Sequence, residues 1–232
     1  MLTLFDHYAQ SQDNFIAFEK ILDAFLLRFR LYETLEERDT ALSRLNEFAS
    51  DTAMLALFEE IGILSEGFND PLGELFMLRV SRGKQGQFFT PTPVCDLMTA
   101  LTLGSVQTGQ SVLDPACGSG RMLLSAAKQN RHIRCYGADV DAICVKMAVM
   151  NMLLQSLSGE IAHMDSLSNS FYSCYRIGTV LRDGYHYPYY RWVTDPAESV
   201  IVIRSKEANS PAQASFNPVP MPTGKGQQGS LF

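Results

Sequence analysis

Val112-Leu-Asp-Pro-Ala-Cys-Gly-Ser-Gly-Arg-Met-Leu-Leu124 contains, in this order, a short apolar stretch, an aspartate, a turn with two glycines and an apolar run of helical character. The order predicts a strand, a glycine turn and a helix. In such a unit, backbone N–H groups of the turn and of the helix start face the carboxyl end of the strand, where ligands bind. Because many strand–helix loops contain two glycines and bind nothing, the neighbouring sequence has to decide between a structural and a binding role.

After this segment the apolar pattern alternates between strands and helices. A β-α-β-α-β order predicts a parallel sheet with right-handed crossovers, and hence an α/β fold. We expect strands over 111–113, 134–138 and 160–163 and helices over 121–128 and 142–154. Farther on, Arg182-Asp-Gly184 is a turn signal between two aromatic-rich stretches, so a hairpin is predicted over 171–181 and 185–193, with a further strand over 199–204.

The chain before residue 80 has the apolar spacing of helices. One helix is predicted from about residue 15, a second after Asp39 as its N-cap, and a short third one over 72–78. We therefore expect an all-helical segment over 1–80 and an α/β unit with a C-terminal hairpin over 81–206. Residues 207–232 are rich in Pro, Gly, Gln and Ser, a composition typical of disorder.

Composition narrows the function classes. The net charge of −6 argues against a protein that grips nucleic acid through its whole surface, so such a role needs a local patch or a partner. Five scattered cysteines without a Cys-x-x-Cys pair suggest neither a disulfide framework nor a zinc site, and no metal is expected. The start lacks a basic signal region, and no apolar run approaches the roughly 18 residues of a membrane span. A cytoplasmic location is the expectation.

Three aspartates follow the three predicted parallel strands: Asp114, Asp139 and Asp165. Carboxyl ends of parallel strands share one edge, so these carboxylates should line one crevice. Asp139 is placed to accept hydrogen bonds from ribose hydroxyls. Asp165 could accept from an adenine amine, with Met164 as an apolar wall. A ligand with a ribose, an adenine and a cationic head, such as S-adenosylmethionine, fits this set better than a dinucleotide phosphate, which Asp114 would repel.

Four ordered segments resemble the successive motifs of adenine-N6 DNA methyltransferases, and are most like the modification subunits of type I restriction–modification systems. They are Gly86-Gln-Phe-Phe-Thr-Pro91, Asp114-Pro-Ala-Cys-Gly-Ser-Gly120, Tyr136-Gly-Ala-Asp-Val-Asp141 and His163-Met-Asp-Ser-Leu167. Asp70-Pro-Leu-Gly-Glu-Leu-Phe76 also resembles the helix before the first motif, so the likeness spans about residues 70–167. It implies an incomplete Rossmann-like methyltransferase fold, S-adenosylmethionine as cofactor, and action on DNA with a partner subunit.

The resemblance also implies roles for individual residues. The methionine end of the cofactor would be contacted by Phe89, Thr90 and Pro91, and the surrounding loop would be formed by Asp114, Ala116, Gly118 and Gly120. Asp139 would hold the ribose and Asp165 the adenine amine. Core packing is the alternative for Phe88 and Phe89. We interpret Asp141 as a helix N-cap and Cys117 as a small loop residue rather than a nucleophile.

The family's (Asn/Asp/Ser)-Pro-Pro-(Tyr/Phe) motif has no counterpart, because the chain contains no Pro-Pro. In such a motif a polar side chain and a backbone carbonyl accept the hydrogens of the extruded adenine's amine, and an aromatic ring stacks on the base. Weak substitutes are Asn217-Pro-Val-Pro220, Asp195-Pro-Ala, which a strand should follow rather than precede, and Tyr187-Pro-Tyr-Tyr190, which suits hairpin packing. Catalytic residues therefore stay unassigned.

Two functions stay open. One is a shortened DNA adenine-N6 methyltransferase that depends on a partner for DNA contact. The other is a catalytically silent S-adenosylmethionine-binding protein with an accessory role in DNA modification or mobile-element biology. A small-molecule methyltransferase is disfavoured by 86–91, and NAD binding by the lack of Gly-x-Gly-x-x-Gly. At the end of the chain, Gln228, Leu231 and Phe232 resemble a peptide that docks on bacterial sliding clamps.

Overall fold

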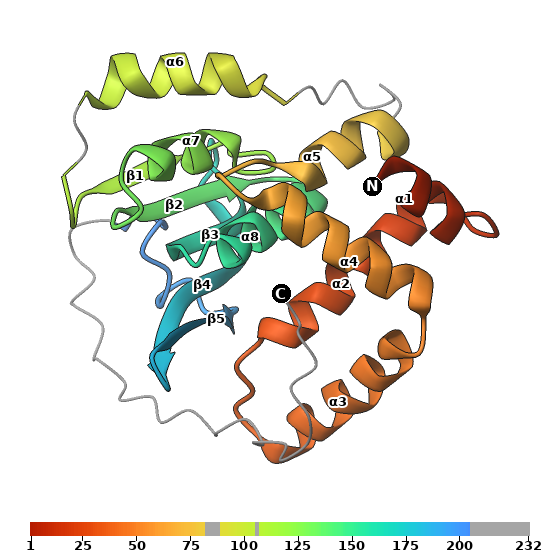
Figure 1. Ribbon diagram of the computed structural model, residues 1–232. Helices are drawn as coiled ribbons and strands as arrows, with labels where there is room; N and C mark the ends of the chain where they lie inside the picture. Colours follow the sequence, from red (N-terminus) through yellow and green to blue (C-terminus); the bar gives the residue numbers. More distant parts are fainter. Residues whose placement is uncertain (82–88, 105–106, 205–232) are drawn as a thin grey trace.

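The computed structural model describes residues 1–81, 89–104 and 107–204, and every structural statement below concerns these residues. Figure 1 shows a helical half beside a sheet. The helices are α1 (Leu2–Tyr8), α2 (Asn14–Phe29), α3 (Leu35–Ala49), α4 (Thr52–Ser65), α5 (Pro71–Leu75), the π-helix η1 (Phe76–Val80), α6 (Thr92–Leu103), α7 (Arg121–Gln129) and α8 (Ala142–Leu154). The strands are β1 (Ser111–Asp114), β2 (Arg134–Asp139), β3 (Ser158–Asp165), β4 (Ser170–Arg182) and β5 (Tyr185–Val193).

The five strands form one sheet in the order β1-β2-β3-β4-β5. The first three are parallel, and β4 and β5 are antiparallel additions beside β3. Asp183 and Gly184 connect β4 to β5, with positive φ values of 52° and 82° that suit the tight turns of two-residue hairpins. The predicted α/β class, the parallel β-α-β-α-β core and the hairpin are therefore confirmed.

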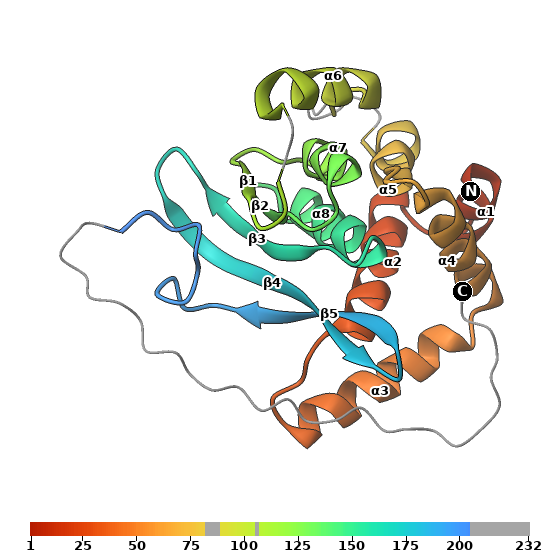
Figure 2. The ribbon, with the colours of Figure 1, turned by 60° about the vertical axis from the view of Figure 1, so that its left-hand side comes forward.

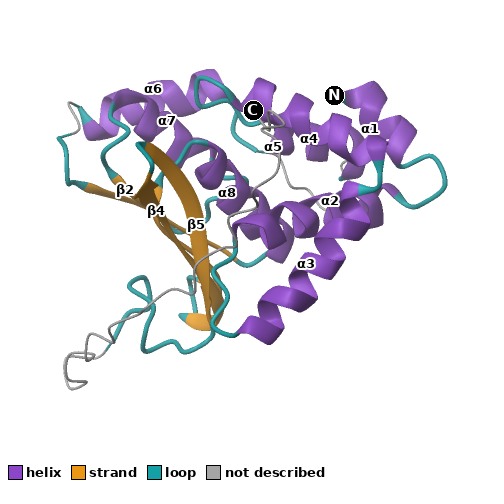
Figure 3. Cartoon of the chain, turned by 60° about the horizontal axis from the view of Figure 1, so that its bottom comes forward, coloured by secondary structure: helices purple, strands orange, loops and turns teal. Residues whose placement is uncertain are grey.

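The main core lies on one face of the sheet. Figure 3 shows the helices on one side of the strands. Helix α8 packs against both β3 and α2, so it is enclosed between the sheet and the N-terminal helices. Nearly all of its residues from Ile143 to Leu153 are buried. On the helical side, the fully buried Phe18 ring lies 6.4 Å from the Phe5 ring and 5.6 Å from the Phe76 ring.

The opposite face of the sheet carries a smaller cluster of Ala138, Ala162, Met164, Cys174 and Val193. The chain after β5 lies against this face through one carboxylate. Glu160, 1% exposed, accepts hydrogen bonds from Ser199 Oγ at 2.5 Å and Val200 N at 3.1 Å, and pairs with Arg176 at 3.5 Å. The strand predicted over 199–204 is wrong, because polar groups of this segment bond to a side chain and not to a neighbouring strand.

The helix predicted after Asp39 is also wrong in its bounds. Two helices occupy that stretch: α3, whose N-cap Thr34 accepts from Glu37 N at 3.2 Å, and α4, whose N-cap Asp51 accepts from Ala53 N and Met54 N at 3.0 Å each.

The sequence pattern did not predict helix α6. It contacts mainly α7, as Figure 2 shows, and leaves Leu97 and Leu101 59% and 76% exposed. None of the described helices could span a membrane.

The two edges of the sheet differ. Beside β5, Leu31 N donates to Tyr190 O at 2.8 Å, so the connection between α2 and α3 covers part of that edge. In the described part of the chain, β1 pairs only with β2. One edge of β1 is therefore open, and the side chain of Leu113 is 56% exposed.

Replacing Phe18 with alanine should lower the free energy of unfolding by about 3–5 kcal/mol, because a fully buried ring that meets two other rings leaves a cavity. Urea denaturation measures this change. Phe15→Ala is the matched control on the same helix: its ring is 43% exposed, and we expect a change within about 0.5 kcal/mol. Equal losses in the two variants would contradict the assigned core.

Candidate functional site

The loops at the carboxyl ends of β1, β2 and β3 are bonded to one another. Asp139, the last residue of β2, accepts from Gly118 N at 2.8 Å and from Asp141 N at 2.9 Å. Ser166, just after β3, donates its hydroxyl to Pro115 O at 2.7 Å. Asp114, Asp139 and Asp165 each end a strand of the parallel part of the sheet, so the structure brings the three predicted carboxylates to one edge.

The turn between β1 and α7 requires its glycines. Gly118 and Gly120 have φ values of 55° and 88°, which side-chain-bearing residues rarely adopt. A Cβ on Gly118 would lie 2.9 Å from the Phe89 ring, and one on Gly120 would lie 3.3 Å from Ala148 Cβ in α8. The loop therefore packs closely between the segment before α6 and helix α8. Ala116, between Asp114 and these glycines, is exposed.

The segment before α6 reaches the same loop. The Phe89 ring stacks on Phe76 at 5.8 Å, and the Arg121 guanidinium lies 5.7 Å from the centre of the Phe89 ring. Thr90 O accepts from Arg121 Nη1 at 3.4 Å, and Pro91 precedes α6 as its N-cap residue. Phe89 thus has a packing role as well as a place beside the glycine loop. Phe88 and residues 86–87 lie outside the described residues.

The pKa values of Asp114 and Asp165 are shifted in opposite directions. Burial, with a smaller effect from the charge of Asp139, raises the pKa of Asp114, and a hydrogen bond from Ala116 N at 3.1 Å opposes the rise. Hydrogen bonds from Ser168 Oγ at 2.8 Å and from Leu167 N at 3.0 Å lower the pKa of Asp165. Asp165 therefore caps its own turn, and Asp114 and Asp139 form a negative pair across the ends of β1 and β2.

The predicted apolar wall is placed differently. Met164 is 3% exposed and belongs to the cluster on the other face of the sheet, so it does not line the strand ends. The β-bulge between His163 and Met164 shifts the register there. Val140 directly follows β2, and it is 63% exposed. Leu167 lies two residues after the end of β3, and it is fully exposed. These two side chains are the apolar groups that the strand ends present to a ligand.

A buried polar cluster around Asp70 is hydrogen-bonded to the glycine loop, and the sequence did not predict it. Asp70, 4% exposed, accepts from Gly73 N at 2.7 Å, Ser119 Oγ at 2.5 Å, Arg121 Nε at 2.6 Å and Asn151 Nδ2 at 2.7 Å. The Asp-Pro pair at 70–71 is a helix-start signal, and it could have identified Asp70 as the N-cap of α5. Its partners in the loop are 49 and 51 residues away and have no sequence signature.

The remaining interpretations concern residues near the loop. Asp141 is the N-cap of α8 and accepts from Ile143 N at 2.8 Å, as predicted. Burial raises the pKa of the Cys117 thiol well above its usual range, which agrees with a small loop residue and not a nucleophile. Burial also raises the pKa of Cys135, to about 12. His163 Nε2 lies 3.1 Å from Val140 O, and its ring packs on Tyr172.

The acceptor-motif substitutes do not assemble at this edge. Asp195 follows β5 and accepts from Ala197 N at 2.8 Å, so the prediction that a strand would follow it is wrong. Tyr190 is buried against Tyr175, in line with hairpin packing. Asn217-Pro-Val-Pro220 lies outside the described residues. The strand after Asp165 is β4, which runs antiparallel to β3 and carries its carboxyl end away from the crevice.

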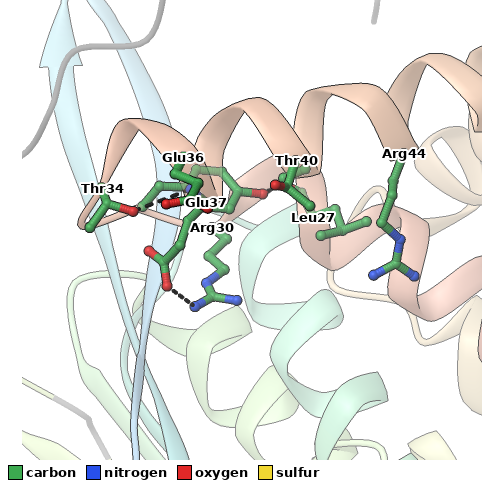
Figure 4. A pocket seen from close by; sticks show the side chains of 9 residues that line it. Leu27, Arg30, Thr34, Glu36, Glu37, Thr40 and Arg44 are labelled. Carbon is green, nitrogen blue, oxygen red and sulfur yellow. Dashed lines mark hydrogen bonds and ion pairs between the residues drawn. The ribbon is translucent and has the colours of Figure 1, made fainter.

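Two hollows lie outside the strand-end site. One of about 290 Å³ lies beside β1 and is lined by Leu113, Tyr136, Val200 and Ile201. The other, of about 310 Å³, lies between α2 and α3 (Figure 4). There Arg30 pairs with Glu37 at 3.7 Å and lies over the rings of Tyr32 and Trp192. The lining also includes Arg44 and Glu36.

Comparison with known proteins gives a consistent result. Residues 74–181 match the N-6 DNA Methylase family. The MpnII methylase subunit of a type I restriction enzyme from Mycoplasma pneumoniae is 27% identical over 176 residues, which cover 72% of this chain and 31% of the relative. The MjaVII methylase subunit from Methanocaldococcus jannaschii is 34% identical over 94 residues, covering 37% of this chain and 16% of the relative.

Among solved structures, the methyltransferase subunit of a type I restriction–modification system from Streptococcus thermophilus is similar with a TM-score of 0.34 and 20% identity, covering 67% of this chain and 37% of that one. The chain spans less than a third of the length of the curated relatives described above. The family match runs from α5 to the end of β4, through the glycine loop and all three strand-end aspartates. Residues 74–181 of this chain are therefore similar to the N-6 DNA methylases, and the chain is similar to the methylase subunits of type I restriction enzymes over part of their length.

Proposed function

We propose that this chain binds S-adenosylmethionine at the carboxyl ends of β1, β2 and β3 and takes part in methylating the N6 amine of adenine in DNA. The observation that carries the proposal is the glycine loop held between Asp139 and Phe89, with two carboxylates, Asp114 and Asp139, at its ends. A negative crevice at the strand ends suits a ligand that is cationic at one end and hydroxylated at the other.

The residues that would hold the cofactor are the predicted set: Phe89, Thr90, Pro91, Asp114, Ala116, Gly118, Gly120, Asp139 and Asp165. Asp139 already accepts two backbone N–H bonds, one on each oxygen, and each oxygen keeps a lone pair for a ribose hydroxyl. Asp165 accepts two hydrogen bonds on Oδ1 and one on Oδ2, so Oδ2 keeps a lone pair for an amine. We add Val140 and Leu167, whose exposed side chains would flank the adenine ring.

When bound, S-adenosylmethionine supplies a methyl group on a positively charged sulfur, and its transfer leaves a neutral thioether. The carboxylates of Asp114 and Asp139 would stabilise the charged donor. Adenine needs groups that accept its amine hydrogens, and the strand that follows Asp165, β4, carries its carboxyl end away from the crevice. We infer that the base-binding groups come from elsewhere, either from residues outside the described ranges or from a further polypeptide.

A partner polypeptide fits two observations. The chain's net charge of −6 gives no general attraction to DNA. In the described part of the chain β1 pairs only with β2, so its other edge could receive a further strand. The family match favours transfer over the silent alternative. The clamp contact through Gln228, Leu231 and Phe232 stays a prediction.

Calorimetric titration tests the cofactor site. Wild-type protein should bind one S-adenosylmethionine, and Asp114→Asn should weaken binding at least about tenfold, because it removes a negative charge next to the sulfonium and keeps the side-chain shape. Asp183→Asn, the same change in the β4–β5 turn, is the matched control and should leave the affinity unchanged. Failure of the wild-type protein to bind would remove the proposal.

The affinity for S-adenosylmethionine should fall as the pH is lowered, and the fall should begin above the pH at which an ordinary aspartate titrates. Burial raises the pKa of Asp114 above its usual 3.8, so its attractive charge is lost early on acidification. The lowered pKa of Asp165 keeps that group ionised over the same window. Titrations between pH 7 and pH 5 check this. An identical pH profile in Asp114→Asn would assign the effect to another group.

Incubation with S-adenosylmethionine and mixed-sequence DNA should yield N6-methyladenine, measured by mass spectrometry of the hydrolysed nucleosides. We expect a rate more than about 10²–10³ times below that of enzymes with a complete acceptor clamp, since losing one transition-state hydrogen-bonding group already costs that much. Asp114→Asn should abolish the product. Cofactor binding without any N6-methyladenine would favour the catalytically silent alternative.

A further inference from the structure

We propose that Asp70 is a positioning residue that sets which form of the cofactor this site prefers. By pairing with Arg121 it holds the glycine loop in place and cancels the guanidinium charge, so that the site favours the cationic methyl donor over the neutral demethylated product. The inference rests on the proposed S-adenosylmethionine site. It assigns a role to a residue of the N-terminal helical segment.

Asp70 acts through other residues, because it is 4% exposed and has no access to a ligand. One of its oxygens, Oδ2, receives both Ser119 Oγ at 2.5 Å and Arg121 Nε at 2.6 Å. The other oxygen receives Gly73 N and Asn151 Nδ2, each at 2.7 Å. Asn151 Nδ2 also donates to Ser119 O at 2.9 Å, so the side chain and the carbonyl of Ser119 are both fixed.

Arg121 passes this constraint on to the candidate site. Its Nη1 donates to Thr90 O at 3.4 Å, and its guanidinium lies 5.7 Å from the centre of the Phe89 ring. The same ring contacts the loop so closely that a Cβ on Gly118 would be 2.9 Å away. Phe89, Thr90 and Gly118 of the proposed site therefore depend on the position of Arg121. That position in turn depends on Asp70.

The charge of Arg121 lies beside the proposed cofactor site, because its guanidinium contacts the Phe89 ring and Thr90 O. The side chain of Arg121 is only 11% exposed and that of Asp70 only 2%, so water screens them poorly. Without Asp70, an uncompensated guanidinium would face a ligand that carries a sulfonium.

The two cofactor forms provide a charge-specific measurement. S-adenosylmethionine has one positive charge more than S-adenosylhomocysteine, and the two are otherwise alike in shape. A purely structural loss would weaken both ligands in the same proportion. A change in the local charge alters the ratio of the two dissociation constants.

The experiment titrates both ligands into the full chain and its variants by calorimetry. Asp70→Asn keeps an N-cap for α5, because asparagine caps helices as well as aspartate does, and it removes the charge. It also replaces one accepting oxygen with an NH2 group, and this structural part of the effect weakens both ligands alike. We expect the preference for S-adenosylmethionine to fall about three- to tenfold in this variant. Arg121→Gln should raise the preference, and Asp70→Asn combined with Arg121→Gln should return it to within about twofold of wild type.

Asp6→Asn is the matched control. Asp6 forms an ion pair with Arg79 at 2.7 Å on an exposed part of the helical segment, away from the proposed site. It should leave both affinities unchanged. A ratio unaltered by Asp70→Asn would overturn the proposal, as would an unaltered ratio in Arg121→Gln if Asp70→Asn does not fold. Absence of binding of both ligands to the wild-type chain is a different result, and it would count against the proposed function itself.

Discussion

The enclosure of helix α8 is the constraint on which the rest of the structure depends. This helix has no exposed face: the sheet covers one side and the N-terminal helices cover the other. Its first turn begins at Asp141, which is bonded to Asp139 of the candidate site, and its last turns contain Asn151, which is bonded to Asp70. Burial of one apolar helix therefore connects the strand-end loops to the helical segment.

Enclosure also explains why the charged side chain of α8, Lys146, is paired. Lys146 points from α8 toward α2 and meets Glu19 at 3.1 Å and Asp23 at 2.8 Å. A buried charge without a partner is strongly destabilising, so each polar side chain on an enclosed helix needs an acceptor or donor from the covering element. The covering helices thus supply charges as well as apolar surface, and residues 1–80 act together with the sheet.

Sequence reasoning succeeded where the signal is local. The strand–turn–helix around Asp114 to Gly120, the alternation up to Asp165 and the turn at Asp183 are each specified by residues close in the chain. It failed where the deciding contact is distant. The stretch after β5 is irregular because Glu160 binds it, and Ser199 is 39 residues away from that carboxylate. Asp70 and Arg121 are 51 residues apart, so their pairing has no periodic pattern.

Helix α6 shows a different reason for failure. Its residues Thr92 to Leu103 are apolar on more than one side, because only Cys95 and Thr99 are buried and Leu97 and Leu101 are exposed. The amphipathic spacing that identifies a surface helix is therefore absent. An apolar side chain that faces solvent obscures the pattern, and the same exposure is found at Leu113 on β1.

The proposed function has two requirements, binding the cofactor and holding the target adenine, and the open edge of β1 bears on the second. The groups proposed for the cofactor all lie on the β1–β3 side of the crevice and are held by contacts within the described chain: Gly118 by Asp139, Ser119 by Asp70, and Phe89 by Arg121. None of these contacts needs a second wall. In the proposed function, cofactor binding therefore needs nothing that pairs with β1, whereas the adenine amine would need acceptor groups in addition to this loop. The proposed transfer would thus require groups added to the site, and not a rearrangement of the loop that is already built.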